Sequence, residues 1–339
     1  MLCQAALCLL AGTGAAAAGT EGAQTLDAVR KRGHLACGVP ASAAPGFAVA
    51  DDKGQWDGLY VEFCHAMAAG VLGSKDAVRF IPLTAGERTE ALSSGTVDVL
   101  LPPVAWTLSR DAELGLLYAG VLFYDGQGFL VRRGDAVTSV LELSGSSICV
   151  LSNTTAEQGV ADFFKARQMK YQLVVSERWP ELVKSYAGGG CTLLTGDVSL
   201  LAHERSRLGR PAEHLLLPEL ITKEPLGPVV REGDDQWFRI ARWTLMALVS
   251  AEELGVSSAN ADQMRASQFQ DVRRLLGADQ SLGQALGLAE DWVHRMVKQT
   301  GNYGEMFERN LGAKSPLRLE RGLNALWSKG GLMYAAPFR

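Results

Sequence analysis

Several features are missing from this sequence of 339 residues, and each absence removes a class of function. No long run of Lys or Arg occurs and the formal net charge is −4, so nucleic acid is not an expected partner. Beyond the first residues, no stretch approaches the roughly 20 apolar residues that span a bilayer, which predicts a soluble mature chain. No CxxC pair is present and the five histidines are scattered, so we expect neither a metal nor a cofactor.

The first residues are typical of an export signal. Residues 2–11 are mostly apolar, and a run of alanines follows at 15–18, which suits signal peptidase. No Lys or Arg precedes Arg30, so the positively charged start of such a signal is missing, and an ordinary core helix is the alternative. Cys8 lies in a poor lipobox, so no lipid anchor is expected. We expect residues 1–24 to be removed and the mature protein to be periplasmic.

The rest of the chain reads as two α/β units. Strand-like and helix-like segments alternate over residues 25–101 and again over 147–195, which predicts mostly parallel sheets. Between the units, residues 123–132 and the return path 224–231 are extended and bounded by Gly and Pro. They predict a two-strand hinge, with ordinary surface hairpins as the alternative. We assign 25–125 and 230–339 to lobe 1, including a helical C-terminal extension, and 126–229 to lobe 2.

Eight short segments, spread in order over about 300 residues, carry a resemblance to a known family. They are TLDAV (25–29), DDKG (51–54), WTLSRD (106–111), YDGQGF (124–129), KEPLGP (223–228), GDDQW (233–237), GNYGE (301–305) and RGLNALW (321–327). The chain resembles the general L-amino-acid-binding proteins of ABC transporters, within the family 3 solute-binding proteins. The resemblance implies a type II periplasmic-binding-protein fold that closes on its ligand. It also implies an L-amino acid as ligand and the membrane permease subunits of an ABC importer as partner; we expect a monomer.

The cysteines outside the expected signal favour disulfides. They are Cys37, Cys64, Cys149 and Cys191, an even number in an exported chain. Three pairings are possible, and joining nearest neighbours keeps each bridge inside one lobe; four buried free thiols are the alternative. The resemblance supports the pairs Cys37–Cys64 and Cys149–Cys191.

A zwitterionic amino acid needs an anion receptor and a cation receptor at a fixed separation. Arg110 is the candidate for the α-carboxylate, because a guanidinium can bond both oxygens and the resemblance places an arginine at this motif. The alternative is a surface arginine paired with Asp111. Asp197 is the candidate for the α-ammonium, because it follows a strand at the carboxyl end of the sheet and the resemblance places an aspartate there. A helix N-cap is the alternative role for Asp197.

Four further residues are weaker candidates for the same site. Thr154 and Thr155 begin a helix after a strand, where free N–H groups and the helix dipole favour an anion; simple capping is the alternative. Phe47 and Trp106 are candidates for the walls of a side-chain pocket, although aromatic residues more often belong to a core.

The chain departs from the family pattern beside Trp106. Relatives usually have Asn-Thr-Thr where this chain has Pro103-Val104-Ala105. The last of these threonines typically bonds the ligand amine, which Ala105 cannot do, whereas Pro103 keeps a carbonyl acceptor. Asn153 also replaces the usual glycine before the two threonines, although Asn tolerates a left-handed backbone fairly well. These departures indicate a change in affinity or ligand class.

No catalytic constellation stands out, and we expect a binding protein rather than an enzyme. The sequence has no nucleophile elbow, Walker loop or HExxH pattern. The alternative is an enzyme similar to cyclohexadienyl dehydratases, since some relatives with this fold act on cyclic dicarboxylates. Such an enzyme needs a general acid or base in the cleft, and nothing in the sequence places Glu87 or Glu90 there.

Overall fold

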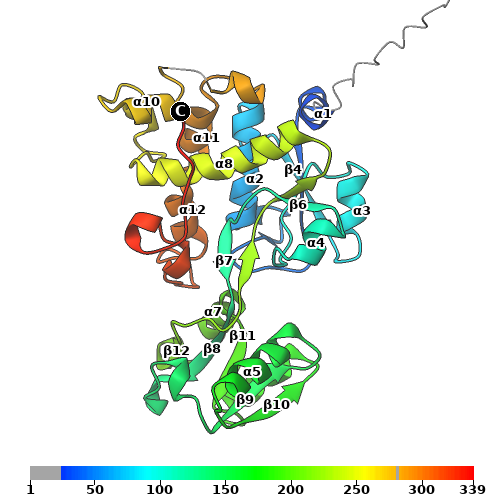
Figure 1. Cartoon of the computed structure of the whole chain (residues 1–339), viewed down its shortest axis with the longest axis vertical. Helices are drawn as coiled ribbons and strands as arrows, with labels where there is room; N and C mark the ends of the chain where they lie inside the picture. Colours follow the sequence, from blue (N-terminus) through cyan, green and yellow to red (C-terminus); the bar gives the residue numbers. More distant parts are fainter. Residues whose placement is uncertain (1–23, 280–281) are drawn as a thin grey trace, which may run out of the picture.

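Two five-stranded sheets form the centres of two lobes, which lie one above the other in Figure 1. The computed structural model describes residues 24–279 and 282–339, so the expected export signal lies outside the described residues apart from Gln24. The first sheet has the order β4-β1-β5-β14-β6 and the second β10-β9-β11-β8-β12. Their strands are β1 (Leu35–Pro40), β4 (Val78–Leu83), β5 (Val99–Leu100), β6 (Leu116–Tyr118), β8 (Gln127–Arg132), β9 (Ser146–Leu151), β10 (Tyr171–Ser176), β11 (Leu193–Asp197), β12 (His214–Leu216) and β14 (Val229–Arg231).

Both sheets are mixed rather than mostly parallel. Strand β1 runs parallel to β4 and β5, and β9 runs parallel to β10 and β11, as the strand–helix alternation predicts. The antiparallel members are β14 in the first sheet and β8 in the second. These are the strands through which the chain enters each sheet directly from the other lobe. They therefore follow no crossover helix, which is the connection that keeps neighbouring strands parallel.

The chain passes between the lobes as a pair of short antiparallel strands, β7 (Phe123–Asp125) and β13 (Glu224–Leu226). The predicted two-strand hinge is confirmed, but it is shorter than predicted because residues 127–132 and 229–231 belong to the two sheets. Gly227 follows β13, and a Cβ there would lie 1.9 Å from the carbonyl oxygen of Gly120, so only glycine allows this close approach. The lobe boundaries at 125/126 and 229/230 stay predictions.

Helices cover both sheets and extend the first lobe. The first lobe contains α1 (Gln24–Arg32), α2 (Leu59–Leu72), α3 (Arg88–Ser93), α4 (Leu108–Ala112) and α8 (Asp235–Glu253); the second contains α5 (Thr155–Ala166), α6 (Trp179–Ala187) and α7 (Val198–Arg207). The C-terminal extension contains α9 (Ala261–Met264), α10 (Gln270–Leu275), α11 (Trp292–Thr300), α12 (Tyr303–Asn310) and the 3-10 turn η6 (Gly322–Asn324). Strands β2 (Val49–Ala50) and β3 (Trp56–Asp57) form a hairpin in the first lobe. No helix among the described residues combines the length and apolar character of a membrane span.

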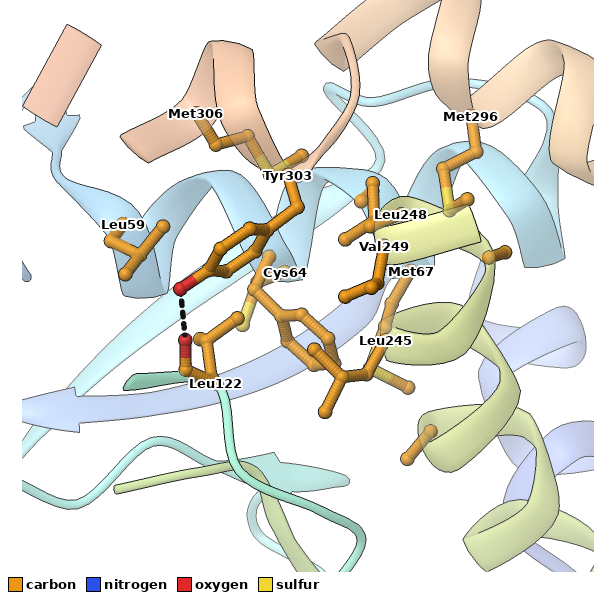
Figure 2. Close-up of a cluster of buried hydrophobic side chains, with 14 of the residues drawn as sticks. Leu59, Cys64, Met67, Leu122, Leu245, Leu248, Val249, Met296, Tyr303 and Met306 are labelled. Atoms are coloured by element: carbon orange, nitrogen blue, oxygen red, sulfur yellow. Dashed lines mark hydrogen bonds between the residues drawn. The ribbon is translucent and has the colours of Figure 1, made fainter. Parts of the chain in front are cut away.

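Helix α2 lies at the centre of the first lobe's core. It is apolar almost all round and ten of its residues are buried, which is typical of a helix with no solvent-facing side. Figure 2 shows side chains of α2, α8, α11 and α12 meeting there, with the buried hydroxyl of Tyr303 donating to the carbonyl of Leu122 over 2.9 Å. The C-terminal extension therefore belongs to the same core as the first sheet.

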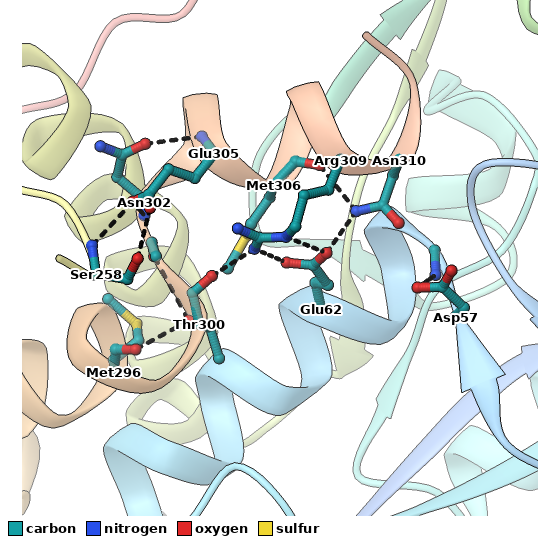
Figure 3. A network of polar contacts seen from close by, with 12 residues as sticks. Asp57, Glu62, Ser258, Met296, Thr300, Asn302, Glu305, Met306, Arg309 and Asn310 are labelled. Carbon is teal, nitrogen blue, oxygen red and sulfur yellow. Dashed lines mark hydrogen bonds and ion pairs between the residues drawn. The ribbon is translucent and has the colours of Figure 1, made fainter. Parts of the chain in front are cut away.

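Polar contacts also fix the extension to the first lobe (Figure 3). Glu62 of α2 accepts hydrogen bonds from Arg309 and Asn310 of α12. Asn302 and Glu305 form a capping box at the start of α12, so the helix begins where its sequence favours a cap.

Both predicted disulfides are present. Cys37 of β1 is bonded to Cys64 of α2, and Cys149 of β9 to Cys191 just before β11. Each bond joins a central strand to its neighbour within one lobe, so neither restrains the movement of one lobe against the other.

Candidate functional site

A cleft of about 320 Å³ lies between the lobes beside the hinge strands. It is lined by Ala43, Ala44, Pro45, Phe47, Tyr60, Pro103, Val104, Ala105, Arg110, Asp125, Thr155, Asp197, Ser199, Leu200, Glu224 and Leu226. Six of the eight predicted ligand-binding residues are among them. The other two, Thr154 and Trp106, are not.

Arg110 lies in the short helix α4, at the edge of the cleft. Its backbone N–H is capped by the Thr107 hydroxyl, and its guanidinium donates to the carbonyl of Ala105 over 2.7 Å. Asp111, the alternative partner, instead accepts from the indole N–H of Trp106 at 3.1 Å. A guanidinium has five N–H donors, so this single anchor orients Arg110 and leaves donors for an anion in the cleft.

Two tyrosine hydroxyls hold the segment before α4, which forms no regular element. Tyr60 donates to the carbonyl of Pro102 at 3.3 Å, and Tyr118 donates to that of Ala105 at 3.3 Å. Burial raises the pKa of Tyr118 to about 12 and also raises that of Tyr60, so both phenols stay protonated and keep donating. Trp106 stacks on Tyr118 with ring centroids 5.5 Å apart, which explains why it supports this wall without lining the cleft.

The two threonines of the second lobe have different roles. The hydroxyl of Thr154 donates to the carbonyl of Leu151 at 2.7 Å and accepts from the backbone of Glu157, so Thr154 caps α5. Thr155, the first residue of α5, lines the cleft. Asn153 has a φ of 58°, so the expected left-handed backbone is present and Asn provides it in place of glycine.

Asp197 ends β11 and occupies the N-cap position of α7, but its side chain makes no capping hydrogen bond. The first N–H of the helix, from Val198, bonds the carbonyl of Gly126 instead. The carboxylate of Asp197 therefore faces the cleft without a capping role. The protein around it raises its pKa by desolvation, which favours a cationic partner for the ionised form.

Two further carboxyl groups, which the sequence did not single out, come from the hinge. Asp125 and Glu224 are directly opposite each other in the β7–β13 pair, so their side chains lie on one face of the hinge. Asp125 is only 5% exposed and accepts from the backbone of Gly126 and from Ser199 in α7. Burial, and then the charge of Asp197, raises the pKa of Asp125 to about 7.

Burial and the same charge of Asp197 also raise the pKa of Glu224. Both hinge positions lay inside the predicted crossing segments, but the register that pairs them was not readable from the sequence.

The cleft can hold a molecule that carries both charges. One cation, Arg110, lies in the first lobe, and acidic groups lie on the hinge and the second lobe. Phe47 is buried and packs against Tyr60 and Phe123 at centroid distances of 4.9 and 5.1 Å, so it forms an apolar floor. No group of three His, Cys, Asp or Glu side chains suited to a metal ion occurs within the described ranges.

The chain is similar in sequence to bacterial binding proteins over nearly its whole length. Residues 35–259 match the model of bacterial extracellular solute-binding proteins, family 3. The chain is 49% identical to the general L-amino acid-binding periplasmic protein AapJ of Rhizobium johnstonii, over 96% of each chain. It is 48% identical to the glutamate/glutamine/aspartate/asparagine-binding protein BztA of Rhodobacter capsulatus, over 95% of each chain.

A solved structure shares the architecture. It is a periplasmic binding protein of an ABC transporter from Brucella ovis with glutathione bound, and it is 48% identical with a TM-score of 0.80. The match covers 93% of this chain and 99% of that one. Two mixed α/β lobes joined by paired strands are thus the type II periplasmic-binding-protein fold that the resemblance implied. The chain belongs to family 3 of the bacterial extracellular solute-binding proteins.

Proposed function

We propose that this protein captures an L-amino acid between its lobes and that Arg110 and Asp197 bind its two charged ends. The observation that carries the proposal is the cleft itself, where a guanidinium of one lobe and a carboxylate of the other line one cavity. Arg110 bonds the α-carboxylate, supplemented by Thr155 and the N-terminus of α5. Asp197 accepts from the α-ammonium, together with the carbonyl of Pro103. Phe47 and Ala105 contact the less polar parts of the ligand.

The protein works as the extracytoplasmic component of an ABC importer. Relatives that match almost end to end are named as a periplasmic amino acid-binding protein, an amino-acid ABC transporter-binding protein and an ABC transporter periplasmic binding protein, which supports a periplasmic location and delivery to membrane permease subunits. An export signal within residues 1–24 and a monomeric state are part of the same proposal.

Glutathione, or another γ-glutamyl peptide, is a second candidate ligand. The Brucella ovis protein has glutathione bound. The γ-glutamyl end of glutathione carries a free α-amino and α-carboxyl group, so it offers Arg110 and Asp197 the same two charges as an amino acid. Pro103, Val104 and Ala105 line the cleft, where the family resemblance implies Asn-Thr-Thr, so the wall next to those charges is less polar than the family pattern.

We propose a binding role rather than catalysis. Glu87 is exposed, and its carboxylate accepts from the backbone and hydroxyl of Thr84. Neither Glu87 nor Glu90 is among the residues that line the cleft. The general acid that a dehydratase requires is therefore not supplied by the positions that the sequence suggested.

Isothermal titration of the mature protein tests the proposal. The protein is unfolded and refolded first, so that a ligand carried through purification is removed. Titrants are the common L-amino acids, their D-enantiomers, deaminated analogues and reduced glutathione. We expect at least one L-amino acid or glutathione to bind with a Kd of about 10 μM or tighter, and D- and deaminated forms at least tenfold more weakly. Failure of every α-amino acid and of glutathione to bind would contradict the proposal.

A further inference from the structure

A third connection between the lobes lies outside the two hinge strands. It is formed by residues 315–324 of the C-terminal extension, here named the pivot segment. The family match ends at residue 259, so this segment lies beyond the region that the family model describes. In Figure 1 the C-terminal extension descends from the first lobe toward the hinge and α7.

The pivot segment binds the hinge strand β7 through Asn324. The side-chain oxygen of Asn324 accepts from the backbone N–H of Tyr124 at 2.7 Å, and its amide nitrogen donates to the carbonyl of Tyr124 at 3.0 Å. These two bonds imitate the pairing of another strand on the edge of β7 away from β13, because Tyr124 directs its backbone groups to the opposite edge from Asp125. Asn324 is only 4% exposed.

Asn324 is itself fixed to the first lobe. Arg321 donates to the carbonyl of Asn324 at 2.8 Å and to Glu252 of α8 at 3.0 Å. The guanidinium of Arg321 also lies over the ring of Phe307 in α12, 4.8 Å from its centroid. Through Arg321 and Asn324, the pivot segment therefore joins the hinge strand β7 to helices α8 and α12.

The same segment contacts the second lobe through one face of α7. Val198, Ala202 and Arg205 are spaced four and three residues apart, so they share a face of this helix. Ala202 is completely buried in the core cluster of the first lobe, which includes Leu317 and Leu319 of the pivot segment, and Val198 packs against that cluster. Arg205 donates to the carbonyls of Leu317 at 2.8 Å and Arg318 at 3.4 Å.

The position of α7 bears directly on the cleft because Asp197 immediately precedes this helix. The distance between Asp197 and Arg110 depends on the angle between the lobes, and that angle is held by β7, β13 and the contact of α7 with the pivot segment. Asn324 bonds the hinge strand itself, where a rotation of the lobes moves atoms least, and Arg205 holds α7 against the pivot segment. Such contacts can persist while the lobes close, and they restrict the path of closure.

We propose that Arg205 and Asn324 are positioning residues that set the range of lobe angles and thereby the affinity for the ligand, although neither touches it. The affinity part of this inference rests on the proposed function. Without either contact, α7 samples more positions relative to the first lobe. Ligand binding must then restrict this motion at a cost in conformational entropy, whereas in the native protein folding alone restricts it. All ligands are weakened alike, because the groups that contact them are unchanged.

The variants are Arg205→Ala, Arg205→Lys and Asn324→Ala, with Arg207→Ala as the matched control. Arg207 is an exposed arginine of the same helix whose side chain makes no hydrogen bond within the described part of the chain. Interlobe distances are measured by double electron–electron resonance between spin labels at Lys31→Cys and Lys165→Cys, two exposed helix positions in different lobes. These measurements use full mature protein without ligand, and calorimetry then gives Kd for each ligand that wild type binds.

We expect a broader distance distribution and a Kd raised roughly three- to tenfold in Arg205→Ala and Asn324→Ala, with a smaller change in Arg205→Lys and none in Arg207→Ala. Arg205 is partly exposed, so its variants remain informative if loss of the buried Asn324 prevents folding. Unchanged distances in Arg205→Ala would overturn the inference, whatever the affinity. Tighter binding would also overturn it, since the contact would then oppose closure. A wild type that binds neither an amino acid nor glutathione would contradict only the proposed function, because the distances are measured without ligand.

Discussion

The two walls of the cleft are built in different ways. In the first lobe, residues 101–107 form no helix or strand, and hydrogen bonds from Tyr60, Tyr118 and Arg110 hold their carbonyls. In the second lobe, Thr155 and Asp197 lie where a strand gives way to a helix, so the course of the backbone places them. The first wall therefore depends on particular side chains, whereas the second depends on topology. Substitutions should accordingly disturb shape in the first wall and mainly charge in the second.

The largest effect is expected from the first wall, in Arg110→Ala. The change removes the proposed partner of the ligand carboxylate and also the donor to the carbonyl of Ala105, so both recognition and local shape should be lost. We expect every amino acid to bind at least about 100-fold more weakly, since a desolvated carboxylate is left without its cation. Calorimetry gives the affinity, and circular dichroism should show an unchanged fold. Binding within a few-fold of wild type would remove Arg110 from the site.

The hinge between the walls should give a pH effect through Asp125. Its pKa is raised to about 7 in the folded protein, against about 3.9 in an unfolded chain. Between these values the folded state binds more protons than the unfolded state, so the free energy of unfolding falls as pH rises. The contribution of Asp125 to the free energy of unfolding falls by about 2 to 3 kcal/mol from pH 5 to pH 8 and is constant above the folded pKa.

Asp125→Asn should remove most of that pH dependence. Urea unfolding of wild type and variant at pH 5 and pH 8 measures it, with Asp162→Asn, an exposed position on α5, as the control. Equal pH dependence in wild type and Asp125→Asn would show that Asp125 is already ionised in the folded protein at pH 5.

The second wall is tested by Asp197→Asn, which removes charge at nearly constant shape. No capping bond of Asp197 is lost, so α7 should remain in place. Ligands with a free α-amine should bind roughly ten- to thirtyfold more weakly, and deaminated analogues should change less than about threefold. Calorimetry with matched pairs of ligands measures the difference. An equal loss for both ligand types would mean that Asp197 does not meet the ammonium.

The contrast between the walls also explains what the sequence could predict. Strands, helices and the positions of Thr155 and Asp197 follow from local patterns, and the strand–helix alternation over residues 25–101 predicts the parallel pairing of β1 with β4 and β5. The roles of Tyr60 and Tyr118 depend on contacts with a distant irregular segment, which no local pattern encodes. The same holds for the pairing of Asp125 with Glu224, because strand register is a tertiary property.

Ala105→Thr is expected to have the smallest effect and to sharpen the comparison most. Ala105 lines the first wall, and its carbonyl accepts hydrogen bonds from Arg110 and Tyr118. The substitution leaves this carbonyl in place and alters only the side chain that faces the cleft. The family resemblance implies a threonine at this position, whose hydroxyl bonds the ligand amine. Restoring one neutral hydrogen bond should tighten the binding of L-amino acids by up to about tenfold.

Ala105→Val is the matched control for this prediction, because valine has the shape of threonine without the hydroxyl. Comparing the two variants by calorimetry over an amino-acid panel separates hydrogen bonding from bulk. Tighter binding by threonine alone would show that the first wall lacks only an acceptor for the ammonium. Weaker binding in both variants would mean that the wall has become specific for a ligand that needs the space. If neither variant changes any affinity, position 105 does not face the ligand, and the first wall recognises the amino acid through Arg110 and backbone carbonyls alone.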